Sequence, residues 1–379
     1  MRQVVIIEAV RSPVGKRDGK LSGILPVHLA ARILKELVSR AHIDPSLAQD
    51  VVMGCVTPMG KQGANIARLA ALQAGFPVEV PAVSINRMCG SSQQAVHFAA
   101  QEILSGDMDI AIGGGIEVMS RVSLGSDWPQ QWPTDFPYPL VHQGISAEMM
   151  AEKWNLTREE LDRFSFESHV KAAAATRRGD FSREMVPIEV TLPDGKVEAM
   201  TIDEGIRFEP NLEKMGKLQP AFKTDGVITA ANSSQISDGA AALLLMSADK
   251  AKELGLKPRA RIVARAVVGS DPVLMLSGPI PATRQVLDRA GLKLDDISAI
   301  EINEAFASVV LAWQKELQPD PVRVNPNGGA IALGHPLGAT GAVLMTKLLH
   351  HLERTGGRYG LQTMCIGHGM ATATIIERL

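Results

Sequence analysis

Short apolar runs alternate with longer amphipathic runs along most of the chain. The first apolar run, Val4 to Ala9, predicts a strand, and residues 26–41 predict a helix because apolar positions recur there at helical spacing. A buried strand is expected over residues 50–56 and a further helix over residues 65–74. Strands that alternate with amphipathic helices are typical of an α/β protein.

The pattern changes after this first part of the chain. Residues 109–120 are expected to form two short strands around the glycine turn Gly113-Gly114-Gly115. Four aromatic–proline pairs follow within residues 128–139. Proline-rich chain continues neither a helix nor a central strand, so this segment is expected to be an ordered loop that packs against another part of the molecule.

Further helices are predicted after the aromatic segment. One covers residues 147–154, and another covers residues 157–178 and is opened by a capping box of Thr157 and Glu160. A hairpin is expected around Pro193-Asp194-Gly195, where turn residues separate two short runs.

The last third of the chain resembles the first. Residues 261–266 predict an opening strand, residues 282–290 predict a helix, and residues 294–303 parallel residues 47–54. Residues 359–378 predict two strands around Gly367-His368-Gly369. Similarity at this long period indicates a duplicated α/β unit, and stacked units bring corresponding loops to one face, at the carboxyl ends of strands.

Composition excludes several classes of protein. The 379 residues are 45% hydrophobic and 21% charged with a net charge of −2, which offers no basic surface for nucleic acid or a membrane. No apolar run is long enough to predict a membrane span. Three cysteines make no disulfide framework and indicate a reducing compartment, so a cytoplasmic location is expected. Neither CxxC nor HExxH occurs, and no metal site is predicted.

Cys89 is the first candidate for chemistry. It stands where a short apolar run gives way to a predicted helix, and a thiol near a helix N-terminus is expected to favour the thiolate. The alternative is a packed apolar thiol, which is what most free cysteines are.

Three further stretches carry polar residues that packing does not explain. Asn303-Glu304 follows an apolar strand, although either residue could simply cap the next helix. His335 lies between Gly334 and Pro336, in backbone that allows close approach, although loop histidines are often only solvated. Cys365 precedes a glycine turn whose N–H groups can stabilise an oxyanion. Two thiols and an imidazole suit covalent acyl transfer with proton transfer.

These stretches together resemble the thiolases, and the resemblance covers essentially the whole chain. Each motif is weak alone, but five in the family's order are specific. The motifs are Asn86-Arg87-Met88-Cys89-Gly90-Ser91-Ser92, Gly113-Gly114-Gly115-Ile116-Glu117-Val118-Met119-Ser120, Asn303-Glu304-Ala305-Phe306, Gly328-Gly329-Ala330-Ile331-Ala332-Leu333-Gly334-His335-Pro336 and Cys365-Ile366-Gly367.

The resemblance implies a fold of two similar α/β halves. Each half has a five-stranded mixed sheet, the layers stack as α-β-α-β-α, and a loop domain is inserted in the first half. The implied N-terminal domain comprises residues 1–119 and about 235–257, the loop domain residues 120–234, and the C-terminal domain residues 258–379.

The resemblance also implies a role for each matching residue. Cys89 would be the acylated nucleophile, His335 its activator and Cys365 the acid/base. Asn303 would hold a water that forms one oxyanion hole with His335 Nε2, and the N–H groups of Cys89 and Gly367 would form the other. The resemblance implies that His142, Arg207 and Ser234 line the CoA channel. It implies that Met275 and Phe306 line the acyl pocket. CoA would be a substrate, with no permanently bound cofactor.

The implied activity is cleavage of a 3-ketoacyl-CoA by CoA to an acyl-CoA and acetyl-CoA, through an acyl-cysteine. This reaction belongs to fatty-acid or side-chain β-oxidation. Within the same class, the alternative is an acetyl-CoA C-acetyltransferase that makes or cleaves acetoacetyl-CoA. Outside it, the alternative is a non-catalytic protein that binds acyl-CoA. A decarboxylating ketosynthase is a further alternative, although that class pairs its cysteine with two histidines.

Four departures from the family pattern concern substrate choice. His368, Gln143 and Gln235 replace a usual glycine, methionine and glycine, and Ser92-Gln93-Gln94 replaces the commoner residues of the nucleophile helix. We expect Ser92, Gln93 and Gln94 to influence which substrate is chosen. The segment before His142 is short compared with tetrameric members, which favours a homodimer. Acyl chain length, direction of flux and any hydratase–dehydrogenase partner stay open.

Overall fold

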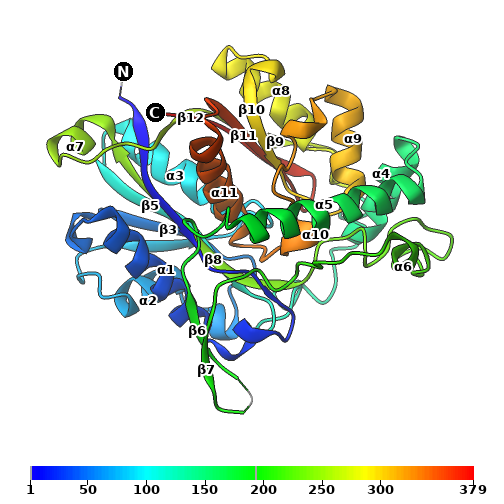
Figure 1. Ribbon diagram of the computed structural model, residues 1–379, viewed down its shortest axis with the longest axis horizontal. Coiled ribbons are helices and arrows are strands. Elements are labelled where there is room, and N and C mark those ends of the chain that lie inside the picture. Colours follow the sequence, from blue (N-terminus) through cyan, green and yellow to red (C-terminus); the bar gives the residue numbers. More distant parts are fainter. Residues whose placement is uncertain (1, 193) are drawn as a thin grey trace.

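The computed structural model describes residues 2–192 and 194–379. They form one large mixed sheet with helices on both sides of each half, and a separate two-stranded sheet (Figure 1). The strands are β1 (Val4–Arg11), β2 (Gly15–Lys16), β3 (Asp50–Gly54), β4 (Ala82–Ile85), β5 (Ile110–Val118), β6 (Ile188–Thr191), β7 (Val197–Met200), β8 (Ser237–Ser247), β9 (Ala260–Gly269), β10 (Ile297–Ile302), β11 (Tyr359–Ile366) and β12 (Met370–Arg378). The α-helices are α1 (Pro26–Ala41), α2 (Ile66–Gln73), α3 (Ser91–Ser105), α4 (Gln143–Lys153), α5 (Arg158–Arg178), α6 (Leu212–Gly216), α7 (Ala248–Glu253), α8 (Pro279–Ala290), α9 (Ala307–Leu317), α10 (Ala330–Leu333) and α11 (Thr340–Thr355).

The predicted duplication is visible in the strand order. The first half runs β4-β3-β5-β8-β1 and the second runs β10-β11-β12-β9. In each half the strand pairs nearest the outer edge are parallel, and the pairs nearer the junction between the halves are antiparallel. The halves join edge to edge, because β1 pairs with β9 through Val5–Arg261 and Ile6–Ala260.

The second half differs from the expected five strands at its outer edge. Where β4 lies in the first half, the second half has only an isolated parallel bridge between Val324 and Ile300. The side chain of Asn325 takes over the pairing that a longer strand would provide. Its Oδ1 accepts from the N–H of Ile302 at 2.9 Å and its Nδ2 donates to the carbonyl of Ile302 at 2.9 Å.

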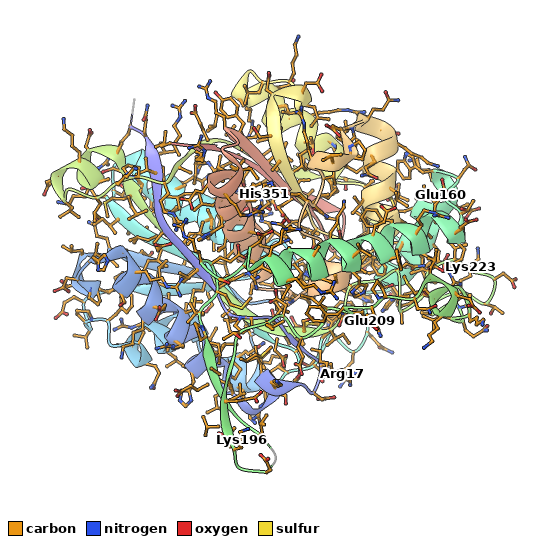
Figure 2. All side chains as sticks on the ribbon, in the orientation of Figure 1. Arg17, Glu160, Lys196, Glu209, Lys223 and His351 are labelled. Carbon is orange, nitrogen blue, oxygen red and sulfur yellow. The ribbon has the colours of Figure 1, made fainter. Side chains whose placement is uncertain are left out.

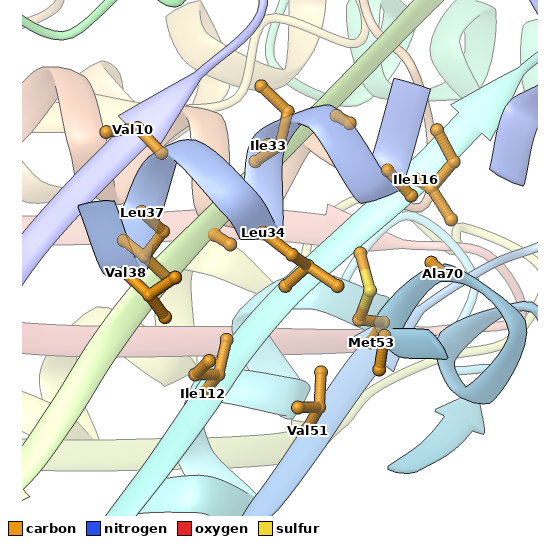
Figure 3. Packing of buried hydrophobic residues seen from close by; sticks show 14 of the residues in the cluster. Val10, Ile33, Leu34, Leu37, Val38, Val51, Met53, Ala70, Ile112 and Ile116 are labelled. Carbon is orange, nitrogen blue, oxygen red and sulfur yellow. The ribbon is translucent and has the colours of Figure 1, made fainter. Parts of the chain in front are cut away.

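Helices from both halves meet in the centre of the molecule. Apolar residues of α3 and α11 form one buried cluster with β1 and β8, so these two helices make the middle layer. On one outer side, α1 and α2 pack on β3 and β5, where Leu34 and Leu37 lie close to Val51 and Ile112 (Figure 3). On the opposite side, α8 and α9 pack on the strands of the second half (Figure 1).

The expected strand–turn–strand over residues 109–120 is wrong. These residues form the single fully buried strand β5, with its three glycines inside it. The glycines serve close packing: a Cβ on Gly113 would lie 2.7 Å from Cα of Val96, and one on Gly115 would lie 2.0 Å from the carbonyl oxygen of Gly338. The expected turn at Gly367-His368-Gly369 does join β11 to β12.

The insertion lies between β5 and β8, where the second half has only that short turn. Arg11 anchors it, since its fully buried guanidinium donates to Glu184 at 2.6 Å and to Asp203 at 2.7 Å. The capping box of Thr157 and Glu160 opens α5 as predicted.

The predicted hairpin within the insertion is also present. It consists of β6 and β7, although Pro193 of its expected turn lies outside the described residues. This hairpin projects from the body of the protein, with Lys196 near its tip (Figure 2). Between Ser120 and α4, the aromatic segment contains neither helix nor strand.

Candidate active site

Cys89 lies in the tight turn between β4 and α3. Met88 adopts a left-handed conformation with φ of 45°, and its N–H is held by Asn86 Oδ1 at 2.8 Å. Ser91 fastens the other side of the turn, because its hydroxyl donates to the carbonyl of Met88 at 2.6 Å and accepts from the N–H of Arg87 at 2.9 Å. The turn sets Cys89 two residues before the start of α3, on the wall of a cavity.

Cys89 is a thiol at rest, contrary to the expectation that the helix would favour its thiolate. Burial raises the pKa of Cys89 to about 11, although hydrogen bonds from the N–H of Gly367, from its own N–H and from the Gln143 side chain act to lower it. Desolvation of the charged form outweighs these donors. Cys89 therefore needs a base to become a nucleophile.

Cys365 is the penultimate residue of β11 and lies beside this turn. The two loops are in close contact, since a Cβ on Gly90 would lie 2.2 Å from Cδ1 of Ile366. Burial raises the pKa of the Cys365 thiol, and the neighbouring charge of Cys89 raises it further. The two thiols are therefore close enough to interact electrostatically.

His335 lies in the short connection between α10 and α11 and is almost fully buried. Its Nδ1 is 2.6 Å from the hydroxyl oxygen of Thr340, and that hydroxyl donates to the carbonyl of Pro336 at 2.8 Å. The Thr340 oxygen therefore accepts from Nδ1–H, which leaves the lone pair on Nε2. Burial lowers the pKa of His335 to about 4, so the imidazole is neutral near pH 7 and can act as a base.

Asn303 faces that lone pair from the end of β10. Its Nδ2 lies 3.3 Å from His335 Nε2, while its buried Oδ1 has no partner among the described residues. An unpaired buried amide oxygen fits the predicted role of holding a water. Asn303 is no helix cap, because α9 begins only at Ala307 with Phe306 as its N-cap residue.

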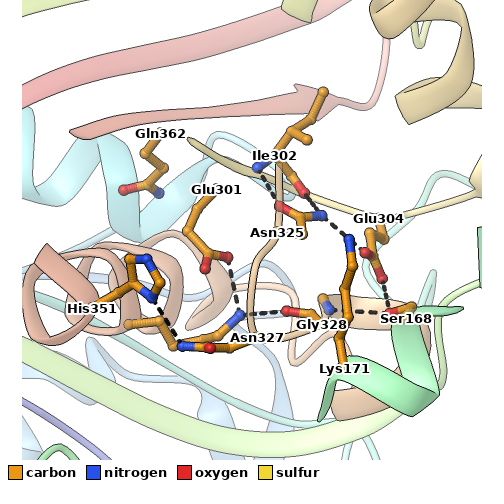
Figure 4. Close-up of polar contacts among 12 residues, drawn as sticks. Ser168, Lys171, Glu301, Ile302, Glu304, Asn325, Asn327, Gly328, His351 and Gln362 are labelled. Atoms are coloured by element: carbon orange, nitrogen blue, oxygen red, sulfur yellow. Dashed lines mark hydrogen bonds and ion pairs between the residues drawn. The ribbon is translucent and has the colours of Figure 1, made fainter. Parts of the chain in front are cut away.

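Glu304 holds the segment that carries Asn303 against the segment before His335. Its carboxylate accepts from the Ser168 hydroxyl at 2.7 Å, from Asn325 Nδ2 at 2.9 Å and from the N–H of Ile331 at 3.2 Å (Figure 4). Glu304 therefore connects the insertion, the outer edge of the second half and α10 at one buried point.

Glu117 is an organising residue that the sequence reasoning did not single out. Its buried carboxylate accepts from the N–H of Val56 at 2.8 Å, from the N–H of Gly338 at 2.9 Å and from Gln62 Nε2 at 2.7 Å. It fixes the loop after β3 to the loop that follows His335. A lone acidic residue inside the apolar run of β5 is the signal that could have revealed it.

The predicted residues are divided between two neighbouring cavities and the interior. A cavity of about 300 Å³ is lined by Cys89, His335, His142, Ser234 and Phe306, among others. A smaller cavity of about 170 Å³ beside it is lined by Gly367 and Met275 and also by His142. Cys365 and Asn303 are buried behind these walls.

Arg207 is the predicted residue that the structure does not bring to the cavities. It is exposed on the insertion, where its backbone N–H donates to His169 Nδ1 at 3.1 Å. It lines neither cavity. His142 has a local role as well, since its Nδ1 accepts from the N–H of Gly144 at 3.0 Å and its ring stacks on Phe222 at 5.2 Å between centroids.

Three of the departures from the family pattern surround the site. Gln143 lines both cavities, and its Nε2 lies 3.1 Å from where a Cβ on Gly367 would be. Gln235 donates through Nε2 to the carbonyls of Gly205 at 3.0 Å and Ile331 at 2.9 Å. His368 lines the smaller cavity.

The fourth departure, which was expected to influence substrate choice, does not reach the cavities. Ser92, Gln93 and Gln94 are buried and line neither cavity. Gln93 donates to Thr374 Oγ1 at 2.7 Å and accepts from the Thr372 hydroxyl at 2.7 Å, both on β12. Gln93 therefore binds α3 to the second half of the protein.

None of the helices in residues 2–192 and 194–379 is long and apolar enough to cross a membrane. In the same part of the chain, His, Cys, Asp and Glu side chains form no group of three or more suited to a metal ion.

Known proteins resemble this chain over its whole length. Residues 4–249 match the thiolase N-terminal domain and residues 256–378 the thiolase C-terminal domain. The chain is 51% identical to a steroid 3-ketoacyl-CoA thiolase of Mycobacterium tuberculosis, covering 100% of this chain and 95% of that protein. It is 45% identical to a 3-ketoacyl-CoA thiolase of Psychrobacter cryohalolentis, covering 100% of this chain and 98% of that protein.

A solved structure gives the same result. The crystal structure of the Bacillus anthracis acetyl-CoA acetyltransferase superposes with a TM-score of 0.93 at 40% identity, covering 100% of this chain and 99% of that one. The predicted fold class is thereby confirmed. With both domains matched and full-length relatives at this identity, the chain belongs to the thiolase family, whose members are acyltransferases that act on CoA and acyl-CoA.

Proposed function

We propose that this protein is a degradative 3-ketoacyl-CoA thiolase that works through an acyl-Cys89 intermediate. The observation that carries the proposal is a neutral, buried His335 on the wall of the cavity that also holds Cys89, with Cys365 beside Cys89. Relatives named as 3-ketoacyl-CoA thiolases support the substrate class, and one of them is named for steroids.

The first half-reaction cleaves the carbon–carbon bond. His335 Nε2 takes the proton of Cys89, and the thiolate attacks the 3-keto carbon of the substrate. The N–H groups of Cys89 and Gly367 stabilise the oxyanion. When the bond between C2 and C3 breaks, the acyl group stays on Cys89 and the acetyl-CoA enolate leaves, held by His335 Nε2–H and a water on Asn303. The Cys365 thiol protonates the enolate carbon.

The second half-reaction restores the enzyme. The Cys365 thiolate takes the proton of an incoming CoA thiol, and the CoA thiolate attacks the acyl-Cys89 carbonyl. Cys89 leaves as a thiolate and regains its proton from His335. Every proton is returned, so the cycle needs no permanently bound cofactor and no metal.

The remaining expectations belong to this proposal. His142 and Ser234 would line the CoA channel, and Met275 and Phe306 the acyl pocket, whereas Arg207 would contact CoA only through its exposed side chain. Domain boundaries near residues 120, 235 and 258, a homodimer and a cytoplasmic location are further predictions. Three free thiols fit that location, since they suit a reducing compartment.

Two alternatives are separated by a substrate series. An acetyl-CoA C-acetyltransferase, the activity named for the Bacillus anthracis structure, would cleave only acetoacetyl-CoA. A non-catalytic binding protein would bind CoA without turnover. We expect thiolysis of 3-ketoacyl-CoA substrates longer than acetoacetyl-CoA, measured by acetyl-CoA release. Activity confined to acetoacetyl-CoA would exclude the proposed specificity.

The two thiols are tested by acyl labelling. Cys89→Ala should abolish acetyl transfer from labelled acetyl-CoA to the protein. Cys365→Ser should still be labelled at Cys89 but should not complete thiolysis, because the carrier of the proton is lost. Labelling of the Cys89→Ala protein would show that another group is the nucleophile.

A further inference from the structure

The smaller cavity adjoins the catalytic one, and the two share part of their lining. Met88, Trp128, His142 and Gln143 line both cavities. Met88 directly precedes Cys89, so the shared lining lies next to the thiol that would carry the acyl group. Its volume of about 170 Å³ is below the roughly 300 to 1,000 Å³ of sites for drug-sized ligands, which limits it to a small ring system or a short chain.

His368 occupies a backbone position that suits glycine better. Its φ is 62°, in the turn between Gly367 and Gly369, and the left-handed conformation is unfavourable for a residue with a Cβ by about 1 kcal/mol or more. A strained residue in a turn that bears on the reacting thiol suggests that its side chain has a use.

The ring of His368 is surrounded by tryptophans of the insertion. Its centroid lies 6.3 Å from the ring of Trp128 and 5.9 Å from the ring of Trp132, the latter at an interplanar angle of 75°. Trp132 is itself supported by Phe136 at 6.0 Å between centroids. The three rings therefore form the wall of the smaller cavity, and we call them the Trp–His clamp: Trp128, Trp132 and His368.

The clamp leaves apolar area uncovered. Trp128 is 39% exposed and Trp132 is 42% exposed, although both line a cavity. Large aromatic surfaces gain stability when an apolar group covers them, and flat or cyclic groups cover them well.

Nε2 is the nitrogen of His368 that can donate a hydrogen bond to a ligand. Nδ1 is buried without a partner among the described residues, and an unpaired buried acceptor is tolerated better than an unpaired buried N–H. This favours the tautomer with the proton on Nε2. Burial also lowers the pKa of His368, so the ring is neutral and presents one N–H donor instead of a positive charge.

We propose that the Trp–His clamp is an acyl-end subsite for a small ring that carries an oxygen acceptor, such as a ring ketone or hydroxyl. The ring would lie against Trp128 and Trp132, and the oxygen would accept from His368 Nε2–H. This inference rests on the proposed thiolase function, because the acyl group reaches the clamp from Cys89.

A matched pair of substrates tests the subsite. Both are 3-ketoacyl-CoA thioesters in which two methylenes join the ketone to a ring, which is 4-oxocyclohexyl in one and cyclohexyl in the other. We expect the protein to prefer the oxygenated substrate by about tenfold or more in kcat/KM, as for a hydrogen bond in a desolvated site. His368→Gly should reduce this preference to within about twofold.

The control variant removes a side chain from the same backbone conformation elsewhere. Gln318 has a φ of 50° and is exposed at the end of α9, so Gln318→Gly relieves the same strain without touching the clamp. It should keep the full preference. A protein with no preference for the oxygenated substrate, or a His368→Gly variant that retains it, would overturn the proposal.

Binding measurements separate this inference from the proposed function. In the Cys89→Ala background, calorimetry with the two saturated acyl-CoA counterparts should show the same preference in Kd and its loss with His368→Gly. If the protein shows this preference in Kd but thiolyses no 3-ketoacyl-CoA, the proposed function fails while the subsite stands. If it thiolyses both equally and binds them equally, the subsite fails while the function stands.

Discussion

The hydroxyl oxygen of Thr340 lies 2.6 Å from Nδ1 of His335, and the same hydroxyl donates to the carbonyl of Pro336. Because the hydroxyl hydrogen is already used, the Thr340 oxygen can only accept from the imidazole. The side chain of the first residue of α11 thus fixes which nitrogen of His335 carries the proton, and so which nitrogen faces the substrate.

Replacing Thr340 should therefore impair proton transfer more than binding. We expect Thr340→Val to lower kcat by about 10- to 100-fold, because the Nε2–H tautomer becomes accessible and can no longer take the proton of Cys89. The KM for CoA should change little. Thr346→Val is the control, since Thr346 is buried on the same helix but bonds only the carbonyl of Ala342. A larger effect on KM than on kcat would contradict this positioning role.

The raised pKa of Cys89 predicts how fast it is alkylated at different pH. With a pKa of about 11, the thiolate fraction rises about tenfold per pH unit between pH 7 and pH 10. Iodoacetamide modification of the Cys89 peptide, followed by mass spectrometry, should rise over this whole range. A plateau near pH 8 would show that the thiolate is stabilised at rest.

The raised pKa of Cys89 also predicts how the stability of the fold changes with pH. The pKa of Cys89 is higher in the folded protein than the roughly 8.5 of an unfolded thiol, so folding favours the protonated form. The contribution is fully present below about pH 8.5 and is lost as pH rises toward about 11. Unfolding midpoints in denaturant should accordingly fall across that window, and the Cys89→Ala protein should show a smaller fall.

Gln143 is expected to assist Cys89 directly. Its side chain is one of the donors that oppose the raised pKa of the thiol, so Gln143→Met should raise that pKa further. At pH 9 the variant should be alkylated about three- to tenfold more slowly, the loss expected for one hydrogen bond to a charged group. Gln130→Met in the exposed aromatic segment is the control. Equal rates in the two variants would remove Gln143 from the site's chemistry.

Asn325 should matter for folding because its side chain replaces a missing strand. Asn325→Ala leaves both backbone groups of Ile302 without these partners and removes one donor to the Glu304 carboxylate, and it puts alanine at a φ of 43°. We expect the free energy of unfolding to fall by about 2 to 3 kcal/mol in denaturant titration.

Two companions separate the causes in that experiment. Asn325→Gly avoids the backbone strain but does not restore the lost hydrogen bonds, so this variant should remain destabilised. Asn327→Ala, which loses bonds to His351 and Arg354 at the edge of α11, should lose only about 1 kcal/mol. Equal losses at Asn325 and Asn327 would argue against the strand-replacement role.

The residues that could be predicted from sequence are those whose local context is unusual. Cys89 at the start of α3, His335 between glycine and proline, and Cys365 before a turn each stood out locally, and the duplication suggested that they meet. The register of the repeat also gave the equivalence of β3 with β10, since apolar periodicity survives where side-chain identity does not.

Other features depend on contacts between distant residues, which local patterns do not carry. The glycines of β5 were expected to form a turn. They are needed instead for close packing against Val96 and Gly338, and this packing cannot be seen in the local sequence. Gln93 was expected to influence substrate choice, but its partners are Thr372 and Thr374 on β12. The pKa of Cys89 was expected to fall, because the helix can be read from sequence and the depth of burial cannot.

The fastening of α3 to β12 by Gln93 has a consequence for how activity is lost. The nucleophile belongs to one half of a duplicated chain and the proton carrier to the other, so their separation is set by the packing between halves. Heat or denaturant that loosens this packing should therefore abolish catalysis before either half unfolds. The catalytic rate then measures how well the two duplicated halves are held together, and not the stability of either half alone.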